Sequence, residues 1–446
     1  MSSLYRRFWR LLLRTSGTFW FAPMALALVA VVLAALCLWV DSTGATTFLA
    51  GIGPPFSFQV DGARSLLSTV AGSIITVASL VFSLTLVALT LAAGNIGSRL
   101  LQRYMRKTTM QLTLGIFVGT FLYVMVVLSV VAKGAVPPLS LGVALLLTVV
   151  SIFWLIYAFH DLARSIQVDK AVADLARDLH RDIRRRAVES HIDLREIDKV
   201  RLPVLFRVLA KADGYVQAVN RDGIVAAARE AEAVVTLRRR SGDFVLAGEE
   251  LADVAMAAPA VGEAAGVAER LREAVQDSVV LGTSRAEGED PTFAVHLVVE
   301  IAGRALSPGV NDFYTALACV NHLGAALAAT LRMELHSGRY GDEDGWLRLI
   351  SNELTFRMIA DSALDPLRHC AVGYPPVLLQ LIDMLLRLAP MTRSQSEREV
   401  LAWHGHQCLV DAGRLLRNAA DHEVAVRTHR RLEAALDRSA EEPQSA

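Results

Sequence analysis

The sequence contains few cysteines, and none of them stand in a paired motif. The 446 residues include only Cys37, Cys319, Cys370 and Cys408, and no two of these form a C-x-x-C pair. Disulfide-stapled domains need several bridges and zinc knuckles need closely spaced thiols, so both classes are excluded. We expect the four cysteines to be small buried side chains in a reducing compartment.

Motifs for catalysis, metal binding and nucleic-acid binding are also absent. The chain has no glycine-rich phosphate loop, no H-E-x-x-H helix and no Walker pattern. His404 and His406 are two residues apart, which puts them on different faces of a helix and makes a metal pair unfavourable. No basic patch with interleaved aromatic residues argues for nucleic acid. We therefore expect no enzymatic activity, no metal and no other cofactor.

Charged residues are missing from four stretches, each longer than the about 20 residues that a helix needs to cross a membrane. These stretches are 15–40, 65–98, 108–132 and 134–160. They predict membrane-spanning helices at about 21–40, 68–93, 111–132 and 139–159. A cleaved signal peptide is an alternative for the first span, but its long apolar run continues into Leu38-Trp39-Val40 instead of a small-residue cleavage site.

The remaining charges are unevenly distributed along the chain. Residues 1–160 contain ten basic and two acidic residues, whereas residues 161–446 contain 35 basic and 43 acidic residues. Basic residues cluster before the first span, between the second and third spans, and after the fourth; the other two loops contain only Arg64 and Lys133. The positive-inside rule therefore places both chain ends on the cytoplasmic side of the membrane.

The second predicted span is rich in small hydroxyl residues. At about 100° per residue, one arc about 100° wide, interrupted by Leu80 and Val87, carries Ser65, Thr69, Gly72, Ser73, Thr76, Ser83, Thr90 and Gly94. The hydroxyl stripe consists of Thr69, Ser73, Thr76, Ser83 and Thr90. Such a stripe lets another helix approach closely, or it lines a pore formed by several copies. None of the predicted spans contains Asp, Glu, His, Lys or Arg, which counts against an ion-coupled transporter.

The part of the chain after the fourth span predicts a mainly helical α+β domain in the cytoplasm. We expect a juxtamembrane helical segment, a small β-containing subdomain, a helical domain and a disordered tail, at 161–213, 214–254, 255–437 and 438–446. Within the subdomain, alternating apolar residues predict strands at 214–219, 233–239 and 244–247, with a short helix at 222–231. The fold class is thus a polytopic α-helical membrane protein with a C-terminal cytoplasmic domain.

The richest polar motif is RALSPGVNDFYTA at 304–316. Pro291 favours a helix at 291–306, Ser307-Pro308-Gly309 ends it, and Asp312 is suited to cap the next helix at 313–331. The candidate ligand or subunit-contact residues are Glu300, Arg304, Ser307, Asn311 and Asp312. A helix joint, a ligand site and a subunit contact all fit this motif, whereas nucleophilic catalysis by Ser307 needs a base that the spacing does not provide.

Several segments resemble a bacterial family of predicted membrane proteins, domain of unknown function 2254. They are SGTFWFAP, VFSLTLVALTLAA, QLTLGIFVGTFLYVMVVL, ARSIQV, SGDFVLAG and ALSPGVND, beginning at residues 16, 81, 111, 163, 241 and 305. The chain departs from the family pattern at 95–99, at Glu300 and at Phe313. The resemblance implies four membrane helices and a cytoplasmic domain, and it implies no activity.

These observations favour a homo-oligomer in the lipid bilayer of a bacterial inner membrane. It has a cytoplasmic sensing or gating domain, whose ligand the sequence does not identify. Two alternatives stay open, a hydroxyl-lined oligomeric channel for ions or small solutes and a membrane scaffold or interaction protein.

Overall fold

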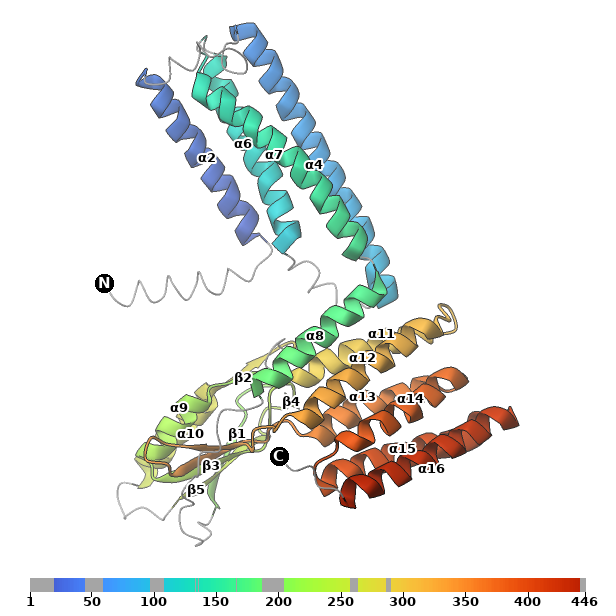
Figure 1. The fold of residues 1–446 in the computed structure, drawn as a ribbon. Coiled ribbons are helices and arrows are strands. Elements are labelled where there is room, and N and C mark those ends of the chain that lie inside the picture. The colour runs from blue at the N-terminus through green and yellow to red at the C-terminus, as the bar shows by residue number, and fades with distance from the viewer. Residues whose placement is uncertain are drawn as a thin grey trace. The chain divides into compact units, whose positions relative to one another are not determined.

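The structure is a computed structural model in which the chain forms two compact units, residues 1–171 and 172–446 (Figure 1). It describes residues 20–44, 59–96, 108–132, 134, 136–165, 167–186, 204–256, 264–285 and 290–441. The basic N-terminal segment, most of the 94–110 loop and residues 187–203 lie outside the described residues, as do the last five residues of the expected tail. Residues 438–441 of that tail belong to the last helix.

The first unit is a bundle of long apolar helices (Figure 1). Its described helices are α2 (Phe21–Ser42), α4 (Val60–Ile96), α6 (Thr108–Val131) and α7 (Pro138–Ser165). α6 packs against each of the other three, and α7 also contacts α2 and α4. All four are long and apolar enough to cross a membrane. They contain the predicted spans 21–40, 68–93 and 139–159, and α6 ends one residue before the end of the predicted span 111–132. With 37 residues, α4 is about 55 Å long and exceeds the hydrocarbon core at its ends.

The contact between α2 and α6 depends on two glycines one helical turn apart. A Cβ at Gly115 would lie 2.5 Å from Leu26 Cδ1 and 3.2 Å from Pro23 Cα, and one at Gly119 would lie 3.3 Å from Ala30 Cβ. The glycines therefore let the two backbones approach more closely than side chains would allow. This is the small-residue packing of membrane helices, here used within one chain.

Two charged side chains of the first unit, Asp41 and Arg64, form hydrogen bonds with backbone groups at the ends of neighbouring helices. Asp41, at the end of α2, accepts hydrogen bonds from Leu139 N (3.1 Å), Ser140 N (2.9 Å) and Ser140 Oγ (2.6 Å), and so caps α7. Arg64 of α4 donates to Ala132 O, just beyond α6, at 3.0 Å. A carboxylate at a helix N-terminus satisfies amides that have no partner within the helix. Both contacts therefore join helices while keeping charge out of mid-span.

The second unit contains two sheets. The five-stranded sheet has the order β1-β5-β3-β8-β7, with β1 (Val204–Leu209), β3 (Ala233–Leu237), β5 (Glu250–Met256), β7 (Arg339–Gly341) and β8 (Leu347–Ile350). The three-stranded sheet has the order β4-β2-β6, with β2 (Gly214–Val219), β4 (Phe244–Val245) and β6 (Val279–Gly282). All pairs are antiparallel except β3 and β8.

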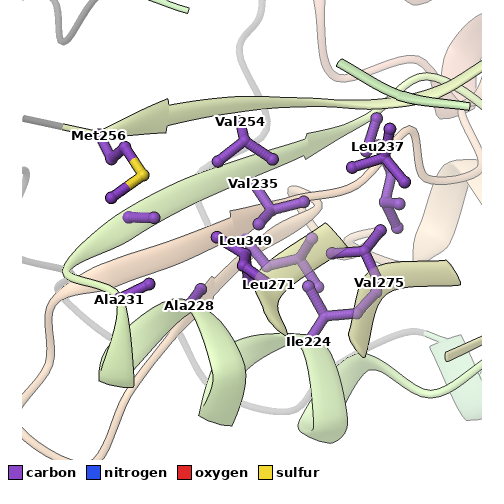
Figure 2. Packing of buried hydrophobic residues seen from close by; sticks show 13 residues of the cluster. Ile224, Ala228, Ala231, Val235, Leu237, Val254, Met256, Leu271, Val275 and Leu349 are labelled. Carbon is purple, nitrogen blue, oxygen red and sulfur yellow. The ribbon is translucent and has the colours of Figure 1, made fainter. Parts of the chain in front are cut away.

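Helices α9 (Arg221–Glu230) and α10 (Ala264–Ser278) cover one face of the five-stranded sheet. Figure 2 shows Ile224 of α9 and Val275 of α10 facing Val235 of β3 and Leu349 of β8. These four side chains are fully buried. Each Å² of apolar surface removed from water contributes about 25 cal/mol, so this layer stabilises the sheet.

Helices make up the rest of the second unit. α8 (Val168–Arg186) precedes the sheets, and its stripe of Val172, Leu175, Leu179 and Ile183 is buried. The bundle that follows consists of α11 (Pro291–Ala305), α12 (Phe313–Arg332), α13 (Phe356–Cys370), α14 (Pro375–Leu388), α15 (Gln395–Leu415) and α16 (Ala419–Glu441). α12 is also long and apolar enough to cross a membrane, but 61% of an apolar 18-residue segment within it is buried in the bundle.

The sheets extend beyond the β subdomain expected at 214–254. β1 lies in the segment expected to be helical, and β6, β7 and β8 lie in the region expected to form a helical domain. β8 pairs with β3 across more than a hundred residues of sequence, and its side chains are almost all buried. A short strand buried on both faces shows no alternation of apolar and polar residues, so periodicity does not reveal it.

A buried polar network joins α13 to α15. His404 is 1% exposed, its Nε2 lies 2.9 Å from Asp361 Oδ1, and its Nδ1 lies 3.7 Å from Asp365 Oδ1. Arg368 pairs with Asp411 beside them. Burial lowers the pKa of His404 below its ordinary value, although both carboxylates act in the opposite direction. Burial also raises the pKa of the neighbouring Cys408 thiol to about 12, which makes the thiol unreactive.

We expect Gly119→Leu to destabilise the first unit by about 1–3 kcal/mol, because its side chain must displace Ala30 and the α2 backbone. Thermal unfolding of the purified protein in detergent measures the change. The matched control is Ala25→Leu, which adds bulk at an exposed position of α2. Equal unfolding midpoints for both variants would contradict this packing.

We expect His404 to make the second unit less stable as the pH falls from 7.5 to 5. The folded-state pKa is depressed, so the unfolded chain takes up a proton that the folded chain resists, and stability is lost below the unfolded value of about 6.5. The pH dependence of the denaturant midpoint should be smaller in His404→Gln than in the unmodified protein. Ser396→Ala, at an exposed position of α15, serves as the control because it removes no titratable group, and it should leave the dependence unchanged.

Candidate functional site

The hydroxyl stripe of α4 lies on the outside of the first unit. Thr69, Ser73, Thr76, Ser83 and Thr90 are all exposed. The hydroxyls of Thr69, Thr76 and Thr90 donate to the carbonyl four residues earlier, at 2.9, 2.7 and 2.8 Å. Each oxygen keeps lone pairs for a further partner. The stripe is therefore compatible with a membrane environment while still presenting polar oxygens.

The opposite face of α4 makes the contacts within the chain. Leu67, Ala71 and Ile74 are buried there, whereas a Cβ at Gly72 or Gly94 on the stripe would meet nothing within 4 Å. Among the described residues, then, no other part of the chain packs on these glycines. Within the described ranges, no other helix of the same chain therefore accounts for the small residues of this stripe.

A separate apolar cavity lies between the second half of α4, the start of α6 and the last turns of α7. It has a volume of about 60 Å³, and Val81, Phe82, Thr85 and Phe117 are among its lining residues. The hydroxyl of Thr113, at its wall, accepts a hydrogen bond from Trp154 Nε1 at 2.9 Å. None of the stripe residues line it. The cavity and the stripe are thus distinct features of α4.

The ALSPGVND motif forms a tight joint between α11 and α12. Ser307 Oγ donates to Arg304 O at 2.7 Å, and Asp312 N donates to Ala305 O at 2.8 Å. Asn311 adopts a φ of 53°, the left-handed conformation that Asn tolerates better than most residues. Asp312 caps α12, as its sequence position predicts, by accepting from Thr315 N at 3.1 Å and Thr315 Oγ1 at 2.6 Å.

The side chains of the other two candidate residues, Glu300 and Arg304, pair with each other and, among the described residues, not with those of Ser307 or Asp312. Glu300 pairs with Arg304 at 3.2 Å along α11, while His296, one turn before Glu300, lies 2.6 Å from an Arg285 nitrogen. The bonds from the Thr315 hydroxyl and amide lower the pKa of Asp312. The joint therefore uses Ser307 and Asp312 to close helix ends, and Pro308, Gly309 and Asn311 are left exposed at its tip.

A polar pocket that the sequence did not reveal lies at the carboxyl ends of strands β3 and β8 of the five-stranded sheet. β3 and β8 run in parallel and end at Leu237 and Ile350, so the segments after them meet at the same edge. The start of α11 completes the pocket, whose volume is about 20 Å³. Crevices at the carboxyl ends of parallel strands are common ligand sites. The lining consists of Val219, Arg221, Arg240, Ser241, Asp290, Thr292, Ser351, Asn352, Glu353 and Leu354.

Two buried polar atoms of this Ser241–Asp290 pocket have no hydrogen-bond partner among the described residues. Asp290 is 3% exposed, and its Oδ1 caps α11 by accepting from Thr292 N at 3.0 Å and Thr292 Oγ1 at 2.5 Å. Its Oδ2 and the Oγ of Ser241, a residue 9% exposed, accept and donate no hydrogen bond there. Buried polar atoms in this state call for a bound water or ligand.

Three arginines surround these atoms with different partners. Arg285 Nε lies 3.5 Å from Asp290 Oδ2 and donates to Gly242 O at 3.0 Å. Arg221 pairs with Glu353 at 2.9 Å, and burial of Glu353 is outweighed by Arg221 and by the Tyr340 hydroxyl, so the pKa of Glu353 is lowered. Arg240 has Asp243 and the Met358 thioether as its acceptors among the described residues.

The turn before the pocket explains one segment noted in the sequence. Gly242 of SGDFVLAG has a φ of 98°, and a Cβ there would overlap Asp290 Oδ2. Glycine thus allows this turn to approach the start of α11. Asp290 directly before Pro291 is a recognisable helix start, but nothing in the sequence indicates that the turn and the helix meet.

Among the described residues, no group of three or more His, Cys, Asp and Glu side chains is arranged to hold a metal ion. All four cysteines are free, and three are buried while Cys370 is half-buried.

Comparison with known proteins places these features in a family. An uncharacterized protein of Mycobacterium bovis and one of Mycobacterium tuberculosis are each 30% identical to the chain over 343 residues. The match covers 75% of this chain and 65% of each relative, so the chain spans about two thirds of their length. No solved structure shows significant similarity. Residues 16–387, which include the membrane helices, the Ser241–Asp290 pocket and the α11–α12 joint, match the predicted membrane proteins of domain of unknown function 2254, and the chain belongs to that family.

Proposed function

We propose that this chain is a non-enzymatic inner-membrane protein that assembles as a homo-oligomer through the hydroxyl stripe of α4. Its second unit senses a small cytoplasmic ligand and transmits binding to the membrane helices. The observation that carries the proposal is the exposed stripe, with open space at Gly72 and Gly94.

The proposed topology has four spans, with both chain ends in the cytoplasm. α2, α4, α6 and α7 pack into one bundle of apolar helices, while the fifth apolar helix, α12, contacts α11, α13 and α14. Trp39 and Tyr157 are exposed near helix ends, where aromatic residues favour the membrane interface. The basic residues before α2 and between α4 and α6 favour the cytoplasmic side for those ends.

The assembly proposal follows from what the stripe presents to the membrane. Lipid tails are as apolar as leucine, so helices associate in a membrane through close packing and interhelical hydrogen bonds. Small residues at the centre of an exposed face supply both, because they let a backbone approach and offer hydroxyl oxygens. Leu80 and Val87, also exposed, would pack against the partner helix beside the stripe.

The sensing role is supported by the Ser241–Asp290 pocket in the second unit. It combines buried unpartnered oxygen atoms with arginine side chains at the carboxyl ends of two parallel strands. Such convergence of a few polar groups in a small concave site is typical of ligand binding.

An oligomeric channel is the second candidate, because the exposed hydroxyl oxygens form one row along most of α4. Several copies arranged around an axis would place these oxygens along a path for ions or small solutes. A scaffold that assembles through the same face without a pore is the other alternative, and flux distinguishes the two.

We predict that Ser73→Cys, with the four native cysteines replaced by alanine, forms a covalent dimer in membranes treated with a mild oxidant. Ser73 lies at the stripe, so copies that pack there bring these thiols together. Ile75→Cys is the matched control, since Ile75 is 43% exposed but lies about 200° further round the helix. Gel electrophoresis without reductant measures the yield. Equal yields at both positions, or no dimer at Ser73, would remove the proposed contact.

For the channel, we expect proteoliposomes to pass small ions and Thr76→Leu to reduce that flux about tenfold or more, because the larger apolar side chain would occlude a narrow polar path. Ile75→Phe adds bulk away from the stripe and should leave flux unchanged. Cross-linking at Ser73 without any flux would favour the scaffold instead.

A further inference from the structure

We propose that the Ser241–Asp290 pocket binds a small organic anion that carries a hydroxyl group beside its anionic group, such as a polyol phosphate or a hydroxy acid. The inference rests on the sensing role given above to the second unit, and it adds the position of the site and the chemistry of the ligand.

The hydroxyl requirement comes from the two unpartnered atoms. Asp290 Oδ2 is a buried acceptor and lacks a donor, while Ser241 Oγ can both donate and accept. One ligand hydroxyl satisfies both, by donating its proton to Asp290 Oδ2 and accepting from Ser241 Oγ. A buried acceptor left without a donor is costly, so the pocket discriminates against ligands that lack this group.

The neighbouring charges favour a hydroxyl over a cation at this point. Arg285 Nε lies 3.5 Å from Asp290 Oδ2, and it already compensates the charge of that carboxylate. A metal ion or ammonium group placed on Oδ2 would be repelled by the guanidinium. A neutral donor is free of that repulsion.

The anionic part of the ligand is assigned to Arg240. Glu353 neutralises Arg221, and Arg285 is engaged with Asp290, Gly242 and His296. Arg240, by contrast, has a carboxylate at 3.5 Å and a thioether, which is a weak acceptor. Its guanidinium therefore keeps donors for a carboxylate or phosphate at the mouth of the pocket.

The size of the pocket sets the size of the inserted group. About 20 Å³ accommodates one group as large as a water molecule. The hydroxyl enters this space, and the anionic group stays outside it beside Arg240, which is half-buried. A water molecule alone is the competing occupant, and it would leave Arg240 without an anion.

Isothermal titration calorimetry on the full chain in detergent tests the inference with four probes. Glycerol 3-phosphate and D-glycerate carry both groups, one with a phosphate and the other with a carboxylate. Inorganic phosphate carries the anion alone, and glycerol carries hydroxyls alone. We expect at least one of the two-group probes to bind at least about tenfold more tightly than either single-group probe.

Two variants locate the binding. Asp290→Asn keeps a side-chain oxygen to cap α11, and Asn is an equally good cap. Its amide NH₂, a donor, then takes the place of the Oδ2 acceptor. Ser241→Ala removes the hydroxyl and carries the test if Asp290→Asn does not fold. Each should weaken binding of the two-group probe about tenfold or more. Ser307→Ala, in the α11–α12 joint, is the matched control and should bind like the unmodified chain.

Three results would overturn the inference. Inorganic phosphate binding as tightly as the two-group probes would reduce the pocket to a simple anion site. No binding of either two-group probe would exclude this ligand class. Binding unchanged in both pocket variants would place the ligand elsewhere, although the sensing role would then still stand. Failure to cross-link at Ser73 would remove the proposed assembly and leave the pocket untouched.

Discussion

Hydrocarbon offers a peptide group no hydrogen-bonding partner, and this constraint governs the first unit. Only segments that satisfy their backbone internally cross such a medium, so the bundle is built from uninterrupted helices. Charged side chains are expensive there, and the described ones near the spans lie at helix ends, as Asp41 and Arg64 do. Apolar surface does not drive association between the helices, so Gly115 and Gly119 contribute by permitting close contact.

The second unit follows a different rule. Its helices and sheets are held by burial of apolar faces, and the polar groups that become buried must find partners within the fold. Most of them do so, as Asp342 does with Arg348 at 2.7 Å. The exceptions gather at a few places, and the Ser241–Asp290 pocket is one where two such atoms from different segments face one small space.

Sequence reasoning recovered the parts that depend on local patterns. The membrane helices follow from charge-free runs, and the cap at Asp312 follows from one residue before an apolar helix. The same reasoning missed β8, which is short and buried on both faces. It therefore also missed the pocket, which depends on β8 lying beside β3. Parallel pairing across a long separation is a tertiary fact, and no local pattern in either strand specifies its partner. The polarity of the α4 stripe was also readable, but its exposure was not.

The contact between Asp41 and the start of α7 has a consequence for biogenesis. The two partners are 98 residues apart, so α2 is synthesised and inserted long before the amides of Leu139 and Ser140 emerge. Until then the carboxylate has only water and headgroups to bind. Capping therefore belongs to the last stage of bundle assembly, when α7 joins α2, and the Asp41 carboxylate gains its helix partner only at that stage.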